Sequence, residues 1–161
     1  MRLAVLLVVA VLVLDQATKA WIVYDVMSPP RIIPVTGFFN LVMVWNRGAS
    51  FGILNTGAAW VPWFLAAVTV AVTIGLVVWL RRTDRWGLAA GIGLIIGGAL
   101  GNLIDRVWYG AVADFVQLYY GNFYWPAFNV ADSAITVGVI LVLIDGFFVA
   151  PAADARKGEA G

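Results

Sequence analysis

The sequence predicts an all-helical membrane protein with four transmembrane helices and a small β element outside the membrane. Of its 161 residues, 63% are hydrophobic and only 12% are charged, and the mean hydropathy is +0.94. These values lie outside the range of soluble domains. Four apolar segments are long enough to cross a bilayer, at residues 3–24, 60–80, 86–104 and 126–149. We expect one domain over residues 1–161.

The first predicted span, residues 3–24, could also be a secretory signal peptide. Leu, Val and Ala run unbroken to Asp15, while Trp21 and Tyr24 suit a membrane interface. However, no small-x-small cleavage site follows the apolar run, and Asp15 would fall within or beside it. We therefore interpret the segment as a retained first helix.

Residues 25–59 change character and predict short strands on the outer membrane face. Pro29, Pro30 and Pro34 remove backbone donors, and a run of β-branched and aromatic residues continues to Trp45. The run is too short for another span. Residues 46–51 then predict a turn that leads back toward the bilayer.

The loop between the second and third spans gives the expected orientation. Arg81, Arg82 and Arg85 lie within five residues, and short loops rich in Arg remain in the cytoplasm. With four spans, both termini are then expected to be cytoplasmic as well.

The third span contains Gly93, Gly97 and Gly101 at i, i+4 and i+8. Such a stripe permits close approach between helices. We therefore predict that this span packs tightly against a neighbour.

Residues 107–125 are aromatic and partly polar, which predicts an interfacial loop or short helix at headgroup level. The fourth span is expected to begin near Pro126, because Pro is tolerated in a first helical turn. Asp132 would then lie roughly 9 Å into the helix. Asp145 is expected to face the cytoplasmic interface without a polar partner, and residues 151–161 are expected to be disordered.

The absence of Cys and His removes several chemistries. Thiolate nucleophiles, imidazole bases, His-rich zinc sites and Ser-His-Asp arrangements are all excluded. A net charge of +1 gives no basic field for nucleic acid. Carboxylates, amides, hydroxyls and Lys therefore remain as candidate functional groups.

Two polar clusters precede the third span's end. Asp15 and Lys19 are spaced i, i+4 with the acid first, which favours a helical ion pair in a supporting role. Asn46 beside Gly48 could hold a turn or contribute to a site.

A third cluster comprises Asn102, Asp105 and Arg106, at i, i+3 and i+4 on one helical face. It could bridge helices, form an interfacial pair or line a site.

Asp132 is the strongest functional candidate, because an ionised carboxylate within a span is costly and needs a partner. Asp114, in the preceding polar loop, is the partner we predict. Two such carboxyl groups held close together would share a proton and act as general acid and base in hydrolysis.

Three other interpretations use the same residues. A proton- or ion-coupled carrier would also place acids in spans, but it should show acids across the full membrane depth and often an internal repeat. A non-catalytic scaffold would explain the glycine stripe alone. A Ser-Lys hydrolase would use Ser50 or Ser133 with Lys19, although Asp15 already faces that lysine.

Five motifs together resemble those of the lipoprotein signal peptidase family, also called signal peptidase II. They are D-Q-A-T-K at residues 15–19, N-R-G-A-S-F at 46–51, G-G-A-L-G-N-L-I-D-R at 97–106, V-A-D-F at 112–115 and F-N-V-A-D at 128–132. They occur in the family's order and extend over all four spans.

The resemblance implies a monomeric aspartic endopeptidase of the bacterial inner membrane, with its active site toward the outer leaflet. It would cleave diacylglyceryl-modified prolipoprotein on the N-terminal side of the lipid-bearing Cys, without cofactor or metal. Membrane lipids and a globomycin-type inhibitor are the other expected ligands. By match to the motifs, the residues divide into catalytic (Asp114, Asp132), substrate-binding (Asn46, Gly48, Asn102, Arg106, Asn129) and supporting (Asp15, Lys19, Asp105).

Overall fold

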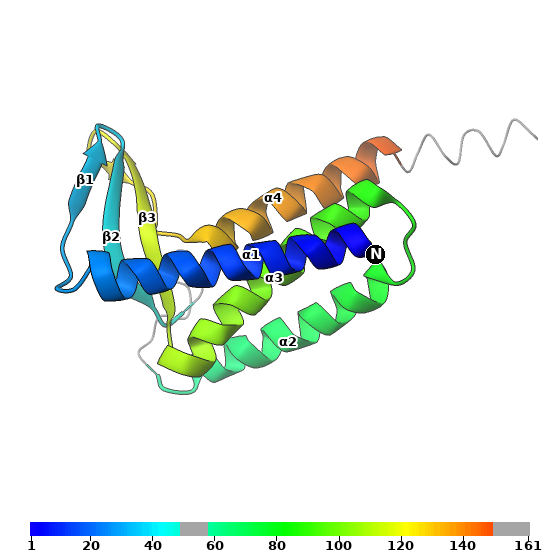
Figure 1. Ribbon diagram of the computed structural model, residues 1–161, viewed down its shortest axis with the longest axis horizontal. Helices are drawn as coiled ribbons and strands as arrows, with labels where there is room; N and C mark the ends of the chain where they lie inside the picture. The colour runs from blue at the N-terminus through cyan, green and yellow to red at the C-terminus, as the bar shows by residue number, and fades with distance from the viewer. Residues whose placement is uncertain (49–57, 150–161) are drawn as a thin grey trace, which may run out of the picture.

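The computed structural model describes residues 1–48 and 58–149. Within these residues it has four helices that are long and apolar enough to cross a membrane, as predicted. The four helices run side by side, and a small sheet covers one end of them (Figure 1). Their bounds are α1 Arg2–Trp21, α2 Val61–Leu80, α3 Trp86–Tyr109 and α4 Val130–Ile144.

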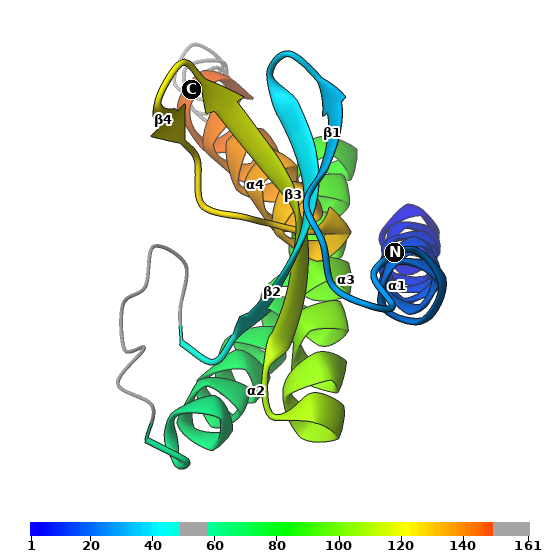
Figure 2. The same cartoon turned by 90° about the vertical axis from the view of Figure 1, so that its left-hand side faces the viewer.

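Helix α3 is the interior helix of the bundle. In its most apolar stretch, 67% of the residues are buried, against 22% in the corresponding stretches of α1 and α4 and 11% in that of α2. Figure 2 shows α3 between α1 and α4, with α2 alongside it. The outward faces of the other helices are apolar and exposed, as lipid-facing surfaces require.

Glycines let α3 approach two neighbours closely. A Cβ at Gly93 would lie 2.9 Å from the Ala4 backbone of α1, which confirms the predicted stripe. A second stripe faces α4, where a Cβ at Gly91 would lie 2.8 Å from the carbonyl oxygen of Gly138. The close approach brings polar side chains of α1, α3 and α4 within hydrogen-bonding reach of one another.

The sheet is antiparallel and has the order β1-β2-β3-β4. Strands β1 (Ile33–Thr36) and β2 (Phe39–Asn46) form the β element that the sequence predicted. The loop or short helix expected within residues 107–125 is instead strand β3 (Val112–Tyr120), followed by β4 (Phe123–Tyr124). Pairing with β2 satisfies the backbone groups of β3, which a local pattern does not reveal.

The fourth helix begins later than predicted. Phe128 pairs with β3 through two 2.9 Å hydrogen bonds to Val116, so the chain stays extended past Pro126. Asp132 therefore lies in the first turn of α4 and not roughly two turns inside it. At the other end of α3, the helix continues to Tyr109 and is capped by Gly110 with φ 67°.

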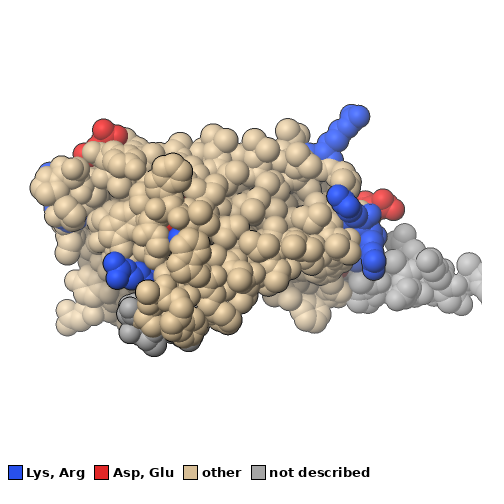
Figure 3. All heavy atoms as spheres, turned by 90° about the horizontal axis from the view of Figure 1, so that it is seen from below, with Lys and Arg blue, Asp and Glu red and all other residues tan. Residues whose placement is uncertain are grey.

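The two ends of the bundle differ in composition. At the sheet end, a cluster of Ile22, Met27 and Phe115 packs the sheet against the end of α1. At the opposite end, the exposed Arg2, Arg81 and Arg82 lie near the chain start and the α2–α3 turn. Basic side chains are visible at that end in Figure 3. Two further expectations, the turn at residues 49–51 and the tail at 151–161, lie outside the described residues.

Candidate active site

Asp132 is fixed by the start of α4. Asn129 is the N-cap residue, and its side-chain oxygen accepts from the Asp132 backbone N–H at 2.9 Å. In return, Asp132 Oδ2 accepts from the Asn129 backbone N–H at 3.2 Å, which completes a capping box. Asp132 Oδ1 accepts from Asn102 Nδ2 at 2.8 Å. Both carboxylate oxygens are therefore held in position.

Asp114 approaches from the sheet. It lies on β3 opposite Val44 and is only 2% exposed. Its Oδ2 accepts from Asn46 Nδ2 at 3.1 Å and its Oδ1 from Asn129 Nδ2 at 2.7 Å. Asn129 thus contacts both acids, and the fold brings together the two carboxylates that the sequence singled out.

Burial and, to a smaller extent, the nearby Asp132 carboxylate raise the pKa of Asp114 to about 7, although hydrogen bonds from Asn46 and Asn129 oppose the shift. A carboxyl group with this pKa holds a proton in a substantial fraction of molecules at neutral pH. The site therefore contains a carboxyl group that can donate a proton near pH 7.

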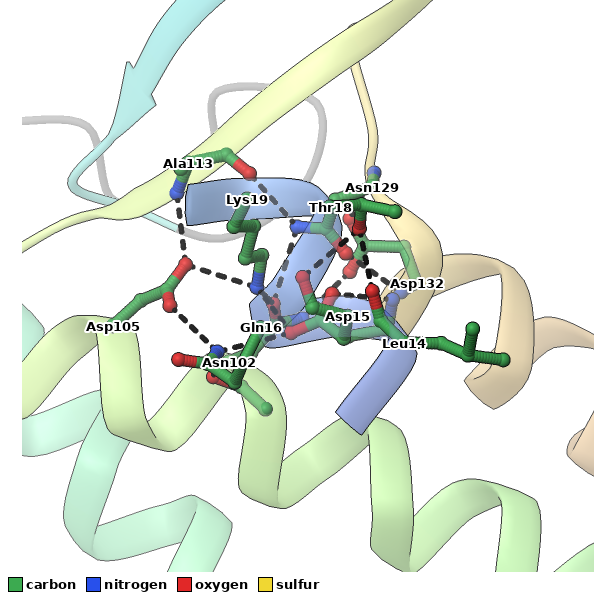
Figure 4. Close-up of polar contacts among 12 residues, drawn as sticks. Leu14, Asp15, Gln16, Thr18, Lys19, Asn102, Asp105, Ala113, Asn129 and Asp132 are labelled. Carbon is green, nitrogen blue, oxygen red and sulfur yellow. Dashed lines mark hydrogen bonds and ion pairs between the residues drawn. The ribbon is translucent and has the colours of Figure 1, made fainter. Parts of the chain in front are cut away.

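Lys19 lies within a buried polar cluster that reaches Asp132 through Asn102 (Figure 4). Its Nζ contacts Asp15 Oδ2 at 2.8 Å, Asp105 Oδ2 at 2.9 Å and Asn102 Oδ1 at 3.0 Å. The predicted Asp15–Lys19 ion pair is confirmed. All three ammonium hydrogens have acceptors, which is how a buried cation is stabilised.

Two other predicted residues adjoin this cluster. Gly48 donates its backbone N–H to Asn46 Oδ1 at 3.1 Å, which leaves the NH₂ group of Asn46 directed at Asp114. Arg106 Nη1 donates to the Asn102 carbonyl at 3.3 Å, and its buried Nε has no hydrogen-bond partner. The Arg106 charge also interacts with Asp132 and Asp114.

A groove of about 590 Å³ opens beside Asp132. One wall comes from α4 and the other from β3 and the segment that leads into α4. The lining residues are Leu118, Trp125, Pro126, Ala127, Phe128, Asp132, Ser133, Thr136 and Val137. The groove is mostly apolar, with a carboxylate on one wall, which suits an amphipathic chain.

One prediction about the acids was wrong and one partner was missed. Asp145 does have a polar partner, because its Oδ2 lies 2.7 Å from Arg85 Nη2 at the end of the bundle opposite the sheet. Gln16 was not singled out, yet its Nε2 contacts Asp15 and Asp105 at 3.2 and 3.1 Å. Its place within the D-Q-A-T-K motif was the available signal. Among the described residues, no group of three or more acidic side chains is arranged to hold a metal ion.

Comparisons with known proteins identify the family. The family model described as signal peptidase (SPase) II matches residues 7–148. The chain belongs to the signal peptidase II family.

Relatives of the signal peptidase II family cover most of the chain. A lipoprotein signal peptidase of Methylorubrum extorquens (strain PA1) is 46% identical over 156 residues, covering 94% of this chain and 90% of the relative. A lipoprotein signal peptidase of Pseudoalteromonas atlantica is 49% identical over 144 residues, covering 88% of this chain and 87% of the relative. A solved structure described as a bacterial membrane enzyme has a TM-score of 0.76 at 36% identity, covering 88% of this chain and 85% of that one.

Membership in the signal peptidase II family makes this chain a multi-pass membrane protein of a peptidase family. The contacts give no support to a Ser-Lys pair. Ser133 Oγ donates to the Asn129 carbonyl at 3.0 Å, while the Lys19 ammonium is occupied by three other acceptors. Ser50 lies outside the described residues.

Proposed function

We propose that this protein is an intramembrane aspartic endopeptidase that removes the signal peptide from diacylglyceryl-modified prolipoproteins. Cleavage occurs on the N-terminal side of the lipidated Cys, with Asp114 and Asp132 as the catalytic pair. The observation that carries the proposal is the Asn129 side chain, which bonds Asp114 at 2.7 Å and caps the helix turn that holds Asp132. Two carboxyl groups from separate elements are thereby held around one amide.

In the starting state we assign the proton to Asp114 and the negative charge to Asp132. Asp132 lines the groove, where it takes a proton from a water molecule as the water oxygen attacks the scissile carbonyl carbon. Protonated Asp114 donates to the carbonyl oxygen. The C–N bond then breaks as the proton held by Asp132 passes to the departing amine, while one hydroxyl of the tetrahedral intermediate returns its proton to Asp114 and becomes the carbonyl of the new carboxyl group. No covalent enzyme intermediate forms.

The surrounding amides hold the acids in this mechanism. Asn102 and Asn129 direct their N–H groups at Asp132 and Asp114, so their contacts favour positioning over the substrate-binding role that the resemblance implied. Arg106 retains an unpaired buried Nε–H, and we assign it to the substrate main chain or lipid-linked end. Asn46 and Gly48 orient Asp114 from the other side.

The substrate arrives through the lipid phase. Val137, which lines the groove, and Ile140, one turn along α4, are 49% and 50% exposed, so this helix face is apolar and open to lipid. A diacylglyceryl chain and a signal helix both partition into the bilayer, and confinement there reduces the entropic cost of aligning the scissile bond. We place both termini in the cytoplasm and the sheet at the outer leaflet, because Arg81, Arg82 and Arg85 lie at the opposite end.

A carrier would need polar groups through the full depth of the bundle. Between the two polar ends, the described residues bury an apolar cluster that includes Ala4, Ile92 and Ile96. The polar groups of the site gather at the sheet end alone, which favours surface-proximal hydrolysis over transport.

The test is cleavage of a synthetic diacylglyceryl prolipoprotein by the purified enzyme in detergent. Asp114→Asn and Asp132→Asn should each lower kcat on the order of 1,000-fold, because each removes a proton-transfer group. Asp84→Asn, an exposed acid between α2 and α3, is the matched control and should cleave normally. Near-normal cleavage by either site variant would refute the dyad, and equal cleavage of unlipidated substrate would refute the substrate class.

A further inference from the structure

Each of the two proposed catalytic acids is the last residue of a Val-Ala-Asp tripeptide, Val112-Ala113-Asp114 and Val130-Ala131-Asp132. In each case the backbone N–H of the alanine is held by a buried carboxylate. Ala113 N–H donates to Asp105 Oδ2 at 3.0 Å, and Ala131 N–H donates to Asp15 Oδ1 at 2.9 Å. The residue before each proposed catalytic acid is thus hydrogen-bonded to a carboxylate from a different element.

Lys19 joins these two supports. Its ammonium lies 2.8 Å from Asp15 Oδ2 and 2.9 Å from Asp105 Oδ2, so one cation links the carboxylate that holds α4 to the carboxylate that holds β3. The third hydrogen is directed at Asn102 Oδ1 at 3.0 Å, and Asn102 donates in turn to Asp132. Figure 4 shows Lys19 extending between Asp105 and Asp15.

The linkage has little freedom to shift. Asp15 is 0%, Asp105 1% and Lys19 3% exposed. Gln16 Nε2 spans the same two carboxylates, and a Cβ at Gly101 would lie 2.5 Å from Asp15 Oδ2, so backbone closes the remaining side. Charge balance alone does not need this arrangement, since one ammonium beside one carboxylate would provide it.

We infer that Lys19 is a positioning residue that sets the separation between the Asp114 and Asp132 carboxyl groups by bridging the supports of β3 and α4. This inference rests on the proposed function. A shift of about 1 Å in a catalytic group can cost on the order of 100-fold in rate without weakening substrate binding. Loss of the bridge should therefore lower kcat and leave KM largely unchanged.

The experiment compares three enzymes on the lipidated substrate in detergent, with thermal unfolding measured in parallel. Lys19→Met should lower kcat on the order of 100-fold with KM within about threefold of the wild type. Arg85→Met is the matched control, because it breaks another ion pair between α3 and the end of α4, far from the site. It should unfold more easily than the wild type and retain kcat.

The compensated variant Asp15→Asn/Lys19→Met/Asp105→Asn separates positioning from charge balance. It leaves no unpaired charge in the cluster, and its amide oxygens can still accept from Ala113 and Ala131. It should regain stability relative to Lys19→Met while kcat stays low. Recovery of full kcat would overturn the inference, and so would normal kcat in Lys19→Met.

The compensated variant also decides the question if Lys19→Met does not fold. Failure of the proposed function gives a different result. In that case the wild type leaves the lipidated substrate uncut, or Asp114→Asn cuts it normally, and the inference about Lys19 falls with it.

Discussion

The same bundle contains two ion-pair groups, one at each end, and they are built differently. At the sheet end, Lys19 bonds three acceptors drawn from α1 and α3 and is 3% exposed. At the opposite end, Arg85 bonds Asp145 through one Nη, its Nε is unpaired, and its side chain is 36% exposed. Both groups tie helices together, but only the first fixes the positions of its neighbours from several directions.

The difference follows from what each end has to hold. At the sheet end, the backbone N–H groups of Ala113 in β3 and Ala131 in α4 donate to carboxylates of the cluster. The Arg85–Asp145 pair connects only the start of α3 with the end of α4. Redundant bonding gives precise placement of side chains, whereas a single exposed pair contributes modest stability. We expect mutations at the two ends to differ more in their effect on enzyme activity than in their effect on folding stability.

The largest effect beyond the acids themselves is expected for Asn129→Ala. The change removes the amide that bonds Asp114 and also the cap of α4, so kcat should fall on the order of 100-fold or more. Loss of an N-cap also costs about 1 kcal/mol of unfolding free energy. Cleavage kinetics and thermal unfolding measure the two effects. Asn122→Ala, in the β3–β4 turn, is the control. An Asn129→Ala enzyme with wild-type kcat would contradict the shared role of this amide.

The pH profile tests the proton assigned to Asp114. This group is protonated below pH about 7 and ionised above it, so kcat/KM should fall about tenfold per pH unit on the alkaline side. Asn46 stabilises the ionised form by donating to it. In Asn46→Ala the pKa should rise and the alkaline fall should move to higher pH. A fall that moves to lower pH would show that Asp114 is not the proton donor.

Packing behind the site is tested at Gly98. A Cβ there would overlap the carbonyl oxygen of Ala131, so Gly98→Ala should displace the start of α4 and destabilise the fold by about 1–3 kcal/mol. Gly75→Ala in α2 is the control, because nothing lies within 4 Å of its added Cβ. Thermal unfolding should separate the two variants. Equal stability would mean that α3 and α4 can move apart without cost.

The smallest effect is expected at the opposite end. Arg85→Met leaves the Asp145 carboxylate without its cation and should cost about 1 kcal/mol, since the arginine is partly exposed. The double variant Arg85→Met/Asp145→Leu should recover part of that loss. Both should cleave substrate at the wild-type rate. A large loss of kcat in either would show that the two ends are coupled.

The sequence alone predicted the four helices and the first two strands, and it singled out Asp114 and Asp132 as candidates. A long apolar run in a bilayer forms a helix, because every backbone polar group must then be hydrogen-bonded within the segment. The glycine spacing and the i, i+4 placement of Asp15 and Lys19 are likewise local patterns. A carboxylate within a span, such as Asp132, is costly enough to be conspicuous without coordinates.

The tertiary structure alone decided how these pieces are joined. Residues 112–120 became a strand because β2 supplies its partner groups, and Asn46 reaches Asp114 across 68 positions in the chain. Phe128 joins the same sheet and delays α4 until Val130. The contacts of Asn129 and Lys19 with several elements, and the pairing of Asp145 with Arg85, depend on the same packing. Such contacts form between segments distant in sequence, and no periodicity within either segment records which partner it will meet.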